Sequence, residues 1–374
     1  MLAFLPELSS LLGFSQTEKD LGFITLLLNL NLITYWFGVK FWGNKLGNLG
    51  IWPCTRIAAA GFLLANLVFW CSLFASDQPS LLLVACSRLL LGVFSSAFVI
   101  LAHSHLSIVS KTNLGQLAKT SGAITLGRLL GPCLALLPLA ANYLLFSPIL
   151  LALPACLYCL SCNPKWTLAS QVEAPPTSPA QVLSSLHFKH ILLLAVLTTS
   201  LVSIVQYYIL PLLFSFGYQG TEATKVYASL LLYLSLALIV YQFVVLPVVS
   251  RSPSLIPAVF LVSLVSGSLL LSFASNAWAL LLVSLAVLAF AISGLPSWYS
   301  QQAYLPNPSV SFRAKRSAYL ARAHTAGYLI GTAVASGCLL LGVPLLVPIC
   351  LFSLAMVTLI IRVNQQAQAQ PSLT

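Results

Sequence analysis

Long apolar segments separated by short polar stretches occupy most of the chain. They lie at about residues 21–42, 51–75, 79–102, 116–140, 143–162, 190–214, 224–249, 254–274, 276–300, 317–341 and 344–362. Each segment is close to the ~20 apolar residues that an α-helix needs to cross a bilayer. The alternating pattern of a membrane β-barrel is not seen. The pattern therefore predicts eleven complete transmembrane helices.

A polar stretch at residues 163–189 divides these helices into two groups. Its prolines and small polar residues are typical of a linker. Five complete helices precede it and six follow, while residues 1–14 resemble the end of a first helix whose beginning is absent. We therefore expect an all-α integral membrane fold of two six-helix bundles. Its parts are an N-terminal bundle at 1–162 with a truncated helix 1, a linker at 163–189, a C-terminal bundle at 190–363 and a tail at 364–374.

The composition agrees with a membrane protein. Hydrophobic residues make up 59% of the 374 residues and charged ones 6%, whereas a soluble domain carries about 25% charged residues. The net charge of +11 comes from basic residues scattered singly between apolar runs. Nucleic-acid binding needs a basic stripe instead, so we expect no nucleic-acid partner.

The basic residues also predict the orientation of the chain. With residues 43–50 placed in the cytoplasm, thirteen of the seventeen Lys and Arg residues fall on the cytoplasmic side. Such an excess marks the cytoplasmic loops of membrane proteins. We expect a multi-pass protein of a cell membrane of the bacterial inner-membrane type, acting as a monomer, with the linker and the C-terminus in the cytoplasm.

No cofactor is expected. The spacing of Cys156, Cys159 and Cys162 resembles that of metal ligands, but no histidine or fourth cysteine lies nearby. Cysteines in apolar segments usually pack as small hydrophobic residues. The chain has no GxxxxGK[ST] phosphate-binding motif, so ATP-driven transport by this chain alone is not expected.

Two apolar segments contain an arginine near the middle, Arg88 and Arg128. A charged residue at that depth is costly and usually functional. Either arginine can line a central cavity and bind an anionic group or tune a nearby acid. Either can also bond to a carbonyl or an internal water and hold helices together. The sequence leaves both interpretations open.

A weak internal repeat relates the two halves. At an offset of 200 residues, Thr125, Gly127, Leu129 and Gly131 match Thr325, Gly327, Leu329 and Gly331. Glycines four residues apart share one helix face and allow close helix contact. Both sets fall in the fifth helix of their half when residues 1–14 count as helix 1. This arrangement is typical of parallel repeats about an axis along the membrane normal.

With these features the chain resembles the major facilitator superfamily, and within it the drug:proton antiporter-like families. The helix-four motif is met by Arg88, Gly92, Ser95, Ser96 and Ala97, with Leu91 in place of the usual glutamine. The helix-five antiporter motif is met by Gly127, Gly131 and Pro132. The loop motif keeps Lys45 and Gly47, but Asn44 replaces its acid and Asn48 a basic residue. Leu5 and Pro6 match the place where helix one leaves the membrane.

The resemblance implies a secondary active transporter that moves a small organic solute by alternating access, with efflux favoured by the helix-five motif. Proton coupling stays open, because no Asp or Glu lies in the middle of a complete span. Two membrane arginines without an acid favour a neutral or anionic solute. The substrate-binding or coupling candidates are Arg88, Arg128, Asn31, Gln206, Tyr207 and His324. A bend at Gly127, Gly131 and Pro132 can serve the rocking of the halves.

Two alternatives remain at this point. A membrane enzyme acting on a lipid-linked substrate needs acids or histidines near the membrane surface, and the cytoplasmic loops contain one acid, Glu173. A transporter-like protein that has lost transport would also explain the degenerate loop motif and the absent core of helix one.

Overall fold

The computed structural model describes residues 5–14, 18–74, 81–109, 126–127, 129–137, 143, 145–161, 185–218, 220–249, 255–274, 277–304 and 310–369. Throughout these ranges the chain forms helices joined by short turns, and none of them contains a strand. This confirms the predicted all-α fold class.

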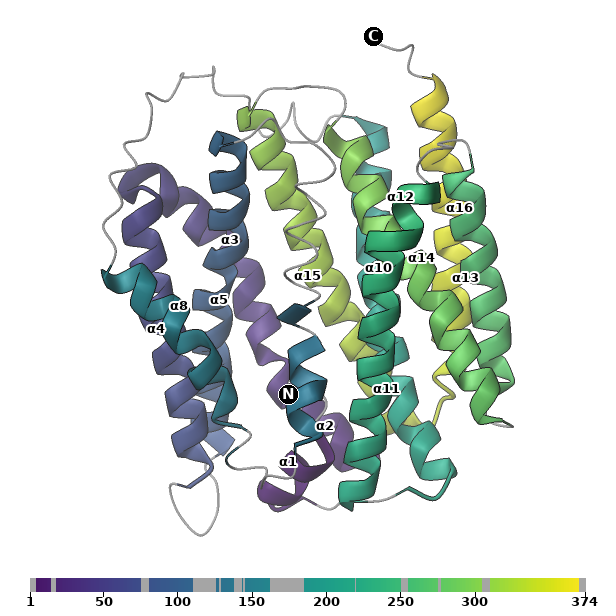
Figure 1. Cartoon of the computed structure of the whole chain (residues 1–374), viewed down its shortest axis with the longest axis horizontal. Helices are drawn as coiled ribbons and strands as arrows, with labels where there is room; N and C mark the ends of the chain where they lie inside the picture. Colours follow the sequence, from purple (N-terminus) through teal and green to yellow (C-terminus); the bar gives the residue numbers. More distant parts are fainter. Residues whose placement is uncertain are drawn as a thin grey trace.

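The helices form two groups along the chain. The N-terminal group comprises α1 (Leu5–Leu11), α2 (Glu18–Leu28), α3 (Leu30–Leu49), α4 (Ile51–Ser72), α5 (Leu81–Val109) and α8 (Ser147–Ser161). The C-terminal group comprises α10 (Leu186–Ser215), α11 (Gly220–Val240), the π-helix η2 (Tyr241–Val245), α12 (Leu246–Val249), α13 (Ile256–Ser272), α14 (Trp278–Tyr304), α15 (Val310–Leu341) and α16 (Leu346–Ala369). We call these groups the N-terminal and C-terminal bundles. In Figure 1, α3, α4, α5 and α8 lie on one side of α15, and α10, α11, α12, α13, α14 and α16 lie on the other.

Within the described residues, eight helical segments are long and apolar enough to cross a membrane. Two shorter apolar helices, Ser147–Ser161 and Ile256–Ser272, accompany them. Together they correspond to ten of the eleven segments that the hydropathy pattern predicts. The eleventh, at 116–140, lies mostly outside the described residues.

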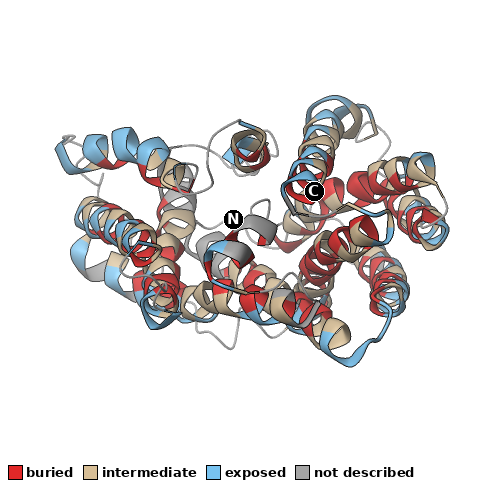
Figure 2. Ribbon diagram, turned by 90° about the horizontal axis from the view of Figure 1, so that it is seen from below, coloured by how far each residue is buried: buried red, intermediate tan, exposed pale blue. Residues whose placement is uncertain are grey.

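The packing of the helices distributes the core unevenly. In the C-terminal bundle, α10 packs along α15 and α16 while α13 packs on α14; in the N-terminal bundle, α5 lies between α3 and α4. Buried residues gather more densely around α10 than in the N-terminal bundle (Figure 2). A smaller cluster around Trp42, Cys54 and Ala58 holds α3, α4 and α5 together. Large apolar side chains such as Leu82 and Val262 are exposed, as lipid-facing positions require.

The two bundles meet along α15. Both α2 and α3 pack against this helix, and α1 packs against α11 of the opposite bundle. The membrane span Gly22–Gly43, formed by α2 and α3, thus contacts the C-terminal bundle through both of its parts. Any change in the angle between the bundles must alter these contacts.

The segment at 43–50, expected as a loop, is helical up to Leu49. The helix ends at Gly50, whose φ of 80° is left-handed and whose N–H bonds to the carbonyl of Leu46. Glycine adopts this conformation without a steric penalty. Lys45 and Gly47 therefore lie in the last turns of α3 instead of in a loop, because a drop in hydropathy marks where a chain reaches water and not where its helix stops.

Two further boundaries differ from those expected. Helix α10 begins at Leu186 and not at residue 190, because the Ser185 side chain accepts a hydrogen bond from the N–H of Phe188 and caps the first turn. The last residues of the expected linker, His187 among them, are therefore helical. Helix α16 continues to Ala369, into the expected tail.

Candidate functional site

A break in the first membrane helix lies at Asn29, between α2 and α3. Carbonyls at such a break lose their helical partners and need others. The Arg88 guanidinium of α5 supplies one, because its Nε donates to the carbonyl of Leu28 at 2.8 Å. Arg88 is only 7% exposed, and its guanidinium lies 5.7 Å from the Phe69 ring centroid. Of the two interpretations of Arg88, the structural one is therefore observed, because the guanidinium bonds to a backbone carbonyl.

Asn29 also bonds across the boundary between the bundles. Its Nδ2 donates to the carbonyl of Thr25 and to the Tyr207 hydroxyl of α10, each at 2.8 Å. Thr25 and Thr332 lie beside the same hydroxyl, and Thr332 bonds to the Ser203 hydroxyl at 3.0 Å. Arg88 is near enough to Tyr207 to interact electrostatically. We call this set the inter-bundle cluster: Thr25, Asn29, Arg88, Ser203, Tyr207 and Thr332.

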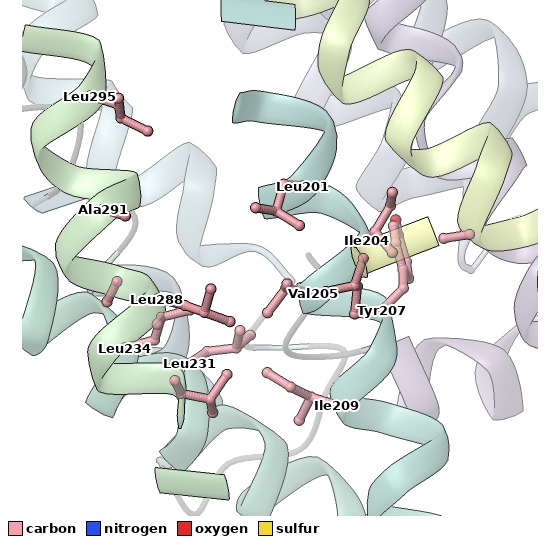
Figure 3. Packing of buried hydrophobic residues seen from close by; sticks show 14 of the residues in the cluster. Leu201, Ile204, Val205, Tyr207, Ile209, Leu231, Leu234, Leu288, Ala291 and Leu295 are labelled. Atoms are coloured by element: carbon pink, nitrogen blue, oxygen red, sulfur yellow. The ribbon is translucent and has the colours of Figure 1, made fainter. Parts of the chain in front are cut away.

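A cavity of about 250 Å³ lies between the N-terminal half of the chain and the C-terminal bundle. One wall comes from Gly127, Gly131 and Pro132, which precede α8 in the sequence. The other comes from α10, α11 and α14. Figure 3 shows the apolar side chains of that wall between these three helices, among them Val205, Leu231, Leu234 and Leu288.

The described lining of the cavity contains two polar side chains, Gln206 and Ser235. Ser235 already donates its hydroxyl to the carbonyl of Leu231 at 2.8 Å. The backbone carbonyl of Gln206 accepts from Tyr227 at 3.0 Å, and no described residue bonds to its carboxamide. The Gln206 carboxamide is therefore the polar group of this lining that is available to a solute.

The two glycine pairs of the internal repeat have different surroundings. In α15, a Cβ on Gly327 would collide with the Val196 carbonyl and the Thr199 hydroxyl, and one on Gly331 with Ser200 and Ser203. Those glycines let α15 approach α10 closely. At Gly127 and Gly131 an added Cβ meets nothing within 4 Å. The N-terminal pair borders the cavity instead of a helix.

Gly92 and Asn31 belong to the packing of α3 on α5. A Cβ on Gly92 would collide with the Asn31 carbonyl and the Thr34 hydroxyl. The Thr34 hydroxyl lies 2.7 Å from the carbonyl of Leu89 and donates to it. The Asn31 Oδ1 is buried, and no described residue donates to it. Asn31 therefore lies close to the cluster in sequence but outside its hydrogen bonds.

His324 lies in the C-terminal bundle, away from the described cavity lining. Its Nε2 is 2.6 Å from the hydroxyl of Tyr299, and its carbonyl accepts from Thr199 at 3.0 Å. Tyr299 is fully buried and Trp298 is 6% exposed. Helix packing therefore encloses both side chains.

A second contact between the bundles escaped the sequence analysis. The Arg322 guanidinium of α15 lies 4.3 Å from the ring centroid of Trp36 in α3. Near the other end of α15, Leu340 lies against Gly22 of α2. Ser203 and Thr332 were missed as well, because hydroxyls are common inside membrane helices and carry little signal by themselves.

The remaining expected site residues are less informative. Arg128 lies outside the described residues. Lys45 is exposed near the end of α3, with its Nζ 5.9 Å from the centroid of the Phe41 ring. Cys156 is buried and Cys159 half-buried, and neither forms a disulfide with a described cysteine. No group of three His, Cys, Asp or Glu residues in the described ranges is arranged to hold a metal ion.

The structure is similar to the crystal structure of the human organic anion transporter MFSD10 (TETRAN). The TM-score is 0.68 at 18% sequence identity, and the match covers 96% of this chain and 89% of that one. No protein-family model matches the chain, and no curated protein matches its sequence. A similarity at this identity establishes the fold alone, an all-helical membrane fold that this chain shares with that protein.

Proposed function

We propose that the protein is a secondary active transporter that moves a small organic solute by alternating access. The observation that carries this proposal is the cavity between the two halves of the chain, with Gly127, Gly131 and Pro132 on one wall and α10, α11 and α14 on the other. A solute bound there contacts both halves, so their rocking exposes it to one side of the membrane and then to the other. The fold, similar to that of an organic anion transporter, supports the same function.

The solute is neutral or anionic. Arg88, in the inter-bundle cluster, is a buried charged side chain with no carboxylate partner among the residues that the structure describes. A cationic solute would meet an uncompensated positive charge in a medium of low dielectric constant. The solved neighbour bears the name of an organic anion transporter, which is consistent with this preference.

Efflux is the direction we propose, on the resemblance of Gly127, Gly131 and Pro132 to the antiporter motif. Proton coupling, if it operates, uses His324, which changes its charge near neutral pH and bonds to the buried Tyr299. We propose a monomer in a membrane of the bacterial inner-membrane type. With the linker and C-terminus in the cytoplasm, the Trp36–Arg322 contact lies on the cytoplasmic side of the Asn29–Tyr207 bond.

Counterflow in proteoliposomes tests the function. Purified protein is reconstituted, loaded with unlabelled aromatic carboxylates, neutral amides or quaternary amines, and supplied with the radiolabelled solute outside. Saturable counterflow of an anion or a neutral amide is expected. Counterflow of the amines alone would contradict the proposed solute class, and folded protein that moves none of them would favour a transport-inactive relative.

A second measurement needs no solute. It tests alternating access even if the counterflow assay does not include the right solute. Cysteines at positions 36 and 322, in a background lacking the native cysteines, report whether α3 and α15 separate. Alternating access predicts partial crosslinking, since only one of the two states keeps these positions together. Complete crosslinking under all conditions would mean that the bundles do not rock.

A further inference from the structure

The cavity between the two halves of the chain has a lining that restricts which part of a solute it can hold. Apart from Gln206 and Ser235, its described lining consists of apolar side chains and glycine. It contains no charged side chain among the described residues. A charge buried without a partner is strongly unfavourable, so the described lining favours an uncharged part of a solute.

The size of the cavity sets a second limit. Pockets for drug-sized ligands run from about 300 to 1,000 Å³, and this one holds about 250 Å³. It therefore accommodates a solute about as large as one substituted ring, or the ring-sized part of a larger molecule.

Gly127 and Gly131 determine how much of that space is open. A Cβ at either position meets nothing within 4 Å, whereas one at Gly327 or Gly331 would collide with α10. A side chain at position 127 or 131 would therefore meet no described neighbour within 4 Å, at the edge of the cavity that both glycines line. The two glycine pairs share a sequence pattern, but only the N-terminal pair can act through an empty volume.

Gln206 supplies the hydrogen bond. Ser235 is bonded to its own helix, while the Gln206 carboxamide presents both a donor and an acceptor. An amide or a hydroxyl on the solute satisfies this group. In an apolar surrounding such a bond also orients the solute, because the polar end can lie only near α10.

We propose that this cavity binds the uncharged, ring-sized part of the solute, with Gly127 and Gly131 setting its maximum size and Gln206 giving its one hydrogen bond. This inference rests on the proposed transport function for its physiological meaning. Its test is a binding measurement and does not require transport.

The probes are benzamide and its 4-methyl, 4-propyl and 4-hexyl derivatives, titrated into detergent-solubilised protein and followed by calorimetry. Wild-type protein is expected to bind the small members and to reject the longest. Gly127→Leu and Gly131→Leu should move this cut-off to a shorter chain. Gln206→Leu should weaken every member by about three- to tenfold, the usual range for one hydrogen bond.

Gly337→Leu is the matched control. Gly337 lies in α15, and an added Cβ there also meets nothing within 4 Å, but it does not line the cavity. The control should leave the cut-off unchanged, and melting temperatures verify that all variants are folded. The proposal would be overturned if Gly131→Leu protein bound the whole series as the wild type does. It would also be overturned if the wild-type protein bound none of the four amides.

The outcomes separate this inference from the transport proposal. Size-limited binding without counterflow of any solute supports the cavity assignment and contradicts transport. If Gly127→Leu and Gly131→Leu show the same counterflow as the wild type, the result supports transport and contradicts the assignment of this cavity as the solute site. The wild type could instead bind 4-alkylbenzoates more tightly than the matching amides, with this binding lost in Gly131→Leu. That result would show that the cavity holds the charged end of the solute, and it would overturn the proposal that the bound part is uncharged.

Discussion

The side-chain amide of Asn29 donates to the Tyr207 hydroxyl at 2.8 Å and joins the two bundles where the first membrane helix breaks. Asn29 also bonds to the carbonyl of Thr25, so one amide serves its own helix and the opposite bundle. Because the bond crosses the boundary between the bundles, its strength contributes to the equilibrium between their arrangements.

Tyr207→Phe removes this bond while the ring stays in place. We expect a loss of about 0.5–1.5 kcal/mol, the usual net value of one hydrogen bond. The loss favours the arrangement in which Asn29 and Tyr207 are apart, so the half-saturation concentration for counterflow should change while the melting temperature falls only slightly. Tyr208→Phe is the control, since no described residue bonds to the neighbouring Tyr208 hydroxyl. Equal effects of the two substitutions would argue against a role of the inter-bundle bond.

Arg88→Ala leaves the carbonyl of Leu28 without its donor and removes a charge from the inter-bundle cluster. Hydrogen bonds to charged groups contribute about 1.5–3 kcal/mol, so the melting temperature in detergent should fall clearly. Arg88→Lys keeps the charge and can restore part of the stability, although an ammonium lacks the planar geometry of the guanidinium. Folded Arg88→Ala protein with unchanged counterflow would exclude a transport role for Arg88 and leave only its structural one.

Gly327→Leu forces α15 away from α10, because even a Cβ would collide with Val196 and Thr199. Overpacking of this kind usually destabilises a protein by about 1–3 kcal/mol. We expect a much lower melting temperature or no folded protein. Gly127→Leu should melt close to wild type, since its Cβ meets nothing within 4 Å. Equal destabilisation by the two substitutions would show that the N-terminal pair also packs against a helix.

Arg322→Gln removes the cation that lies 4.3 Å from the Trp36 ring centroid. Such a contact contributes about 0.5–2 kcal/mol, so its loss should favour separation of α3 from α15. Spin labels on these helices should then report a larger population at long distance. Arg362→Gln, at an exposed position in α16, is the control. An unchanged distance distribution in Arg322→Gln would mean that this contact does not hold the bundles together.

His324→Gln tests proton coupling. If His324 carries the proton, counterflow in the variant should persist, but solute accumulation should no longer respond to an imposed pH gradient. His190→Gln is the control, because His190 bonds to Gln366 and lies far from Tyr299 in the sequence. Accumulation driven equally well by a pH gradient in both variants would exclude His324 as the coupling residue.

Much of the fold was predictable because a bilayer imposes a simple rule on sequence. A helix needs about 20 apolar residues to cross it, so ten predicted segments coincide with described apolar helices. The helix ends were less predictable. Hydropathy placed a loop at 43–50, yet α3 continues to Leu49, because water does not prevent the backbone from keeping its helical hydrogen bonds.

The candidate site was only partly predictable. Polar residues in apolar segments were considered one at a time, and Asn31, Gln206 and Tyr207 were among the substrate-binding or coupling candidates, whereas Asn29 was not. The sequence did not pair Asn29 with Tyr207, since the two are 178 residues apart. Trp36 and Arg322 were not connected at all, because an aromatic residue and a basic residue near helix ends are common at membrane interfaces.

By itself, the sequence determined that this is a helical membrane protein, where most of its spans lie, and which segments carry the repeated glycines. Only the tertiary structure decided what those glycines do. Gly327 and Gly331 face the backbone of α10, whereas Gly127 and Gly131 face a cavity. The physical reason is that the local pattern determines only which residues share a helix face. Whether that face meets another helix or open space depends on how the two bundles are placed.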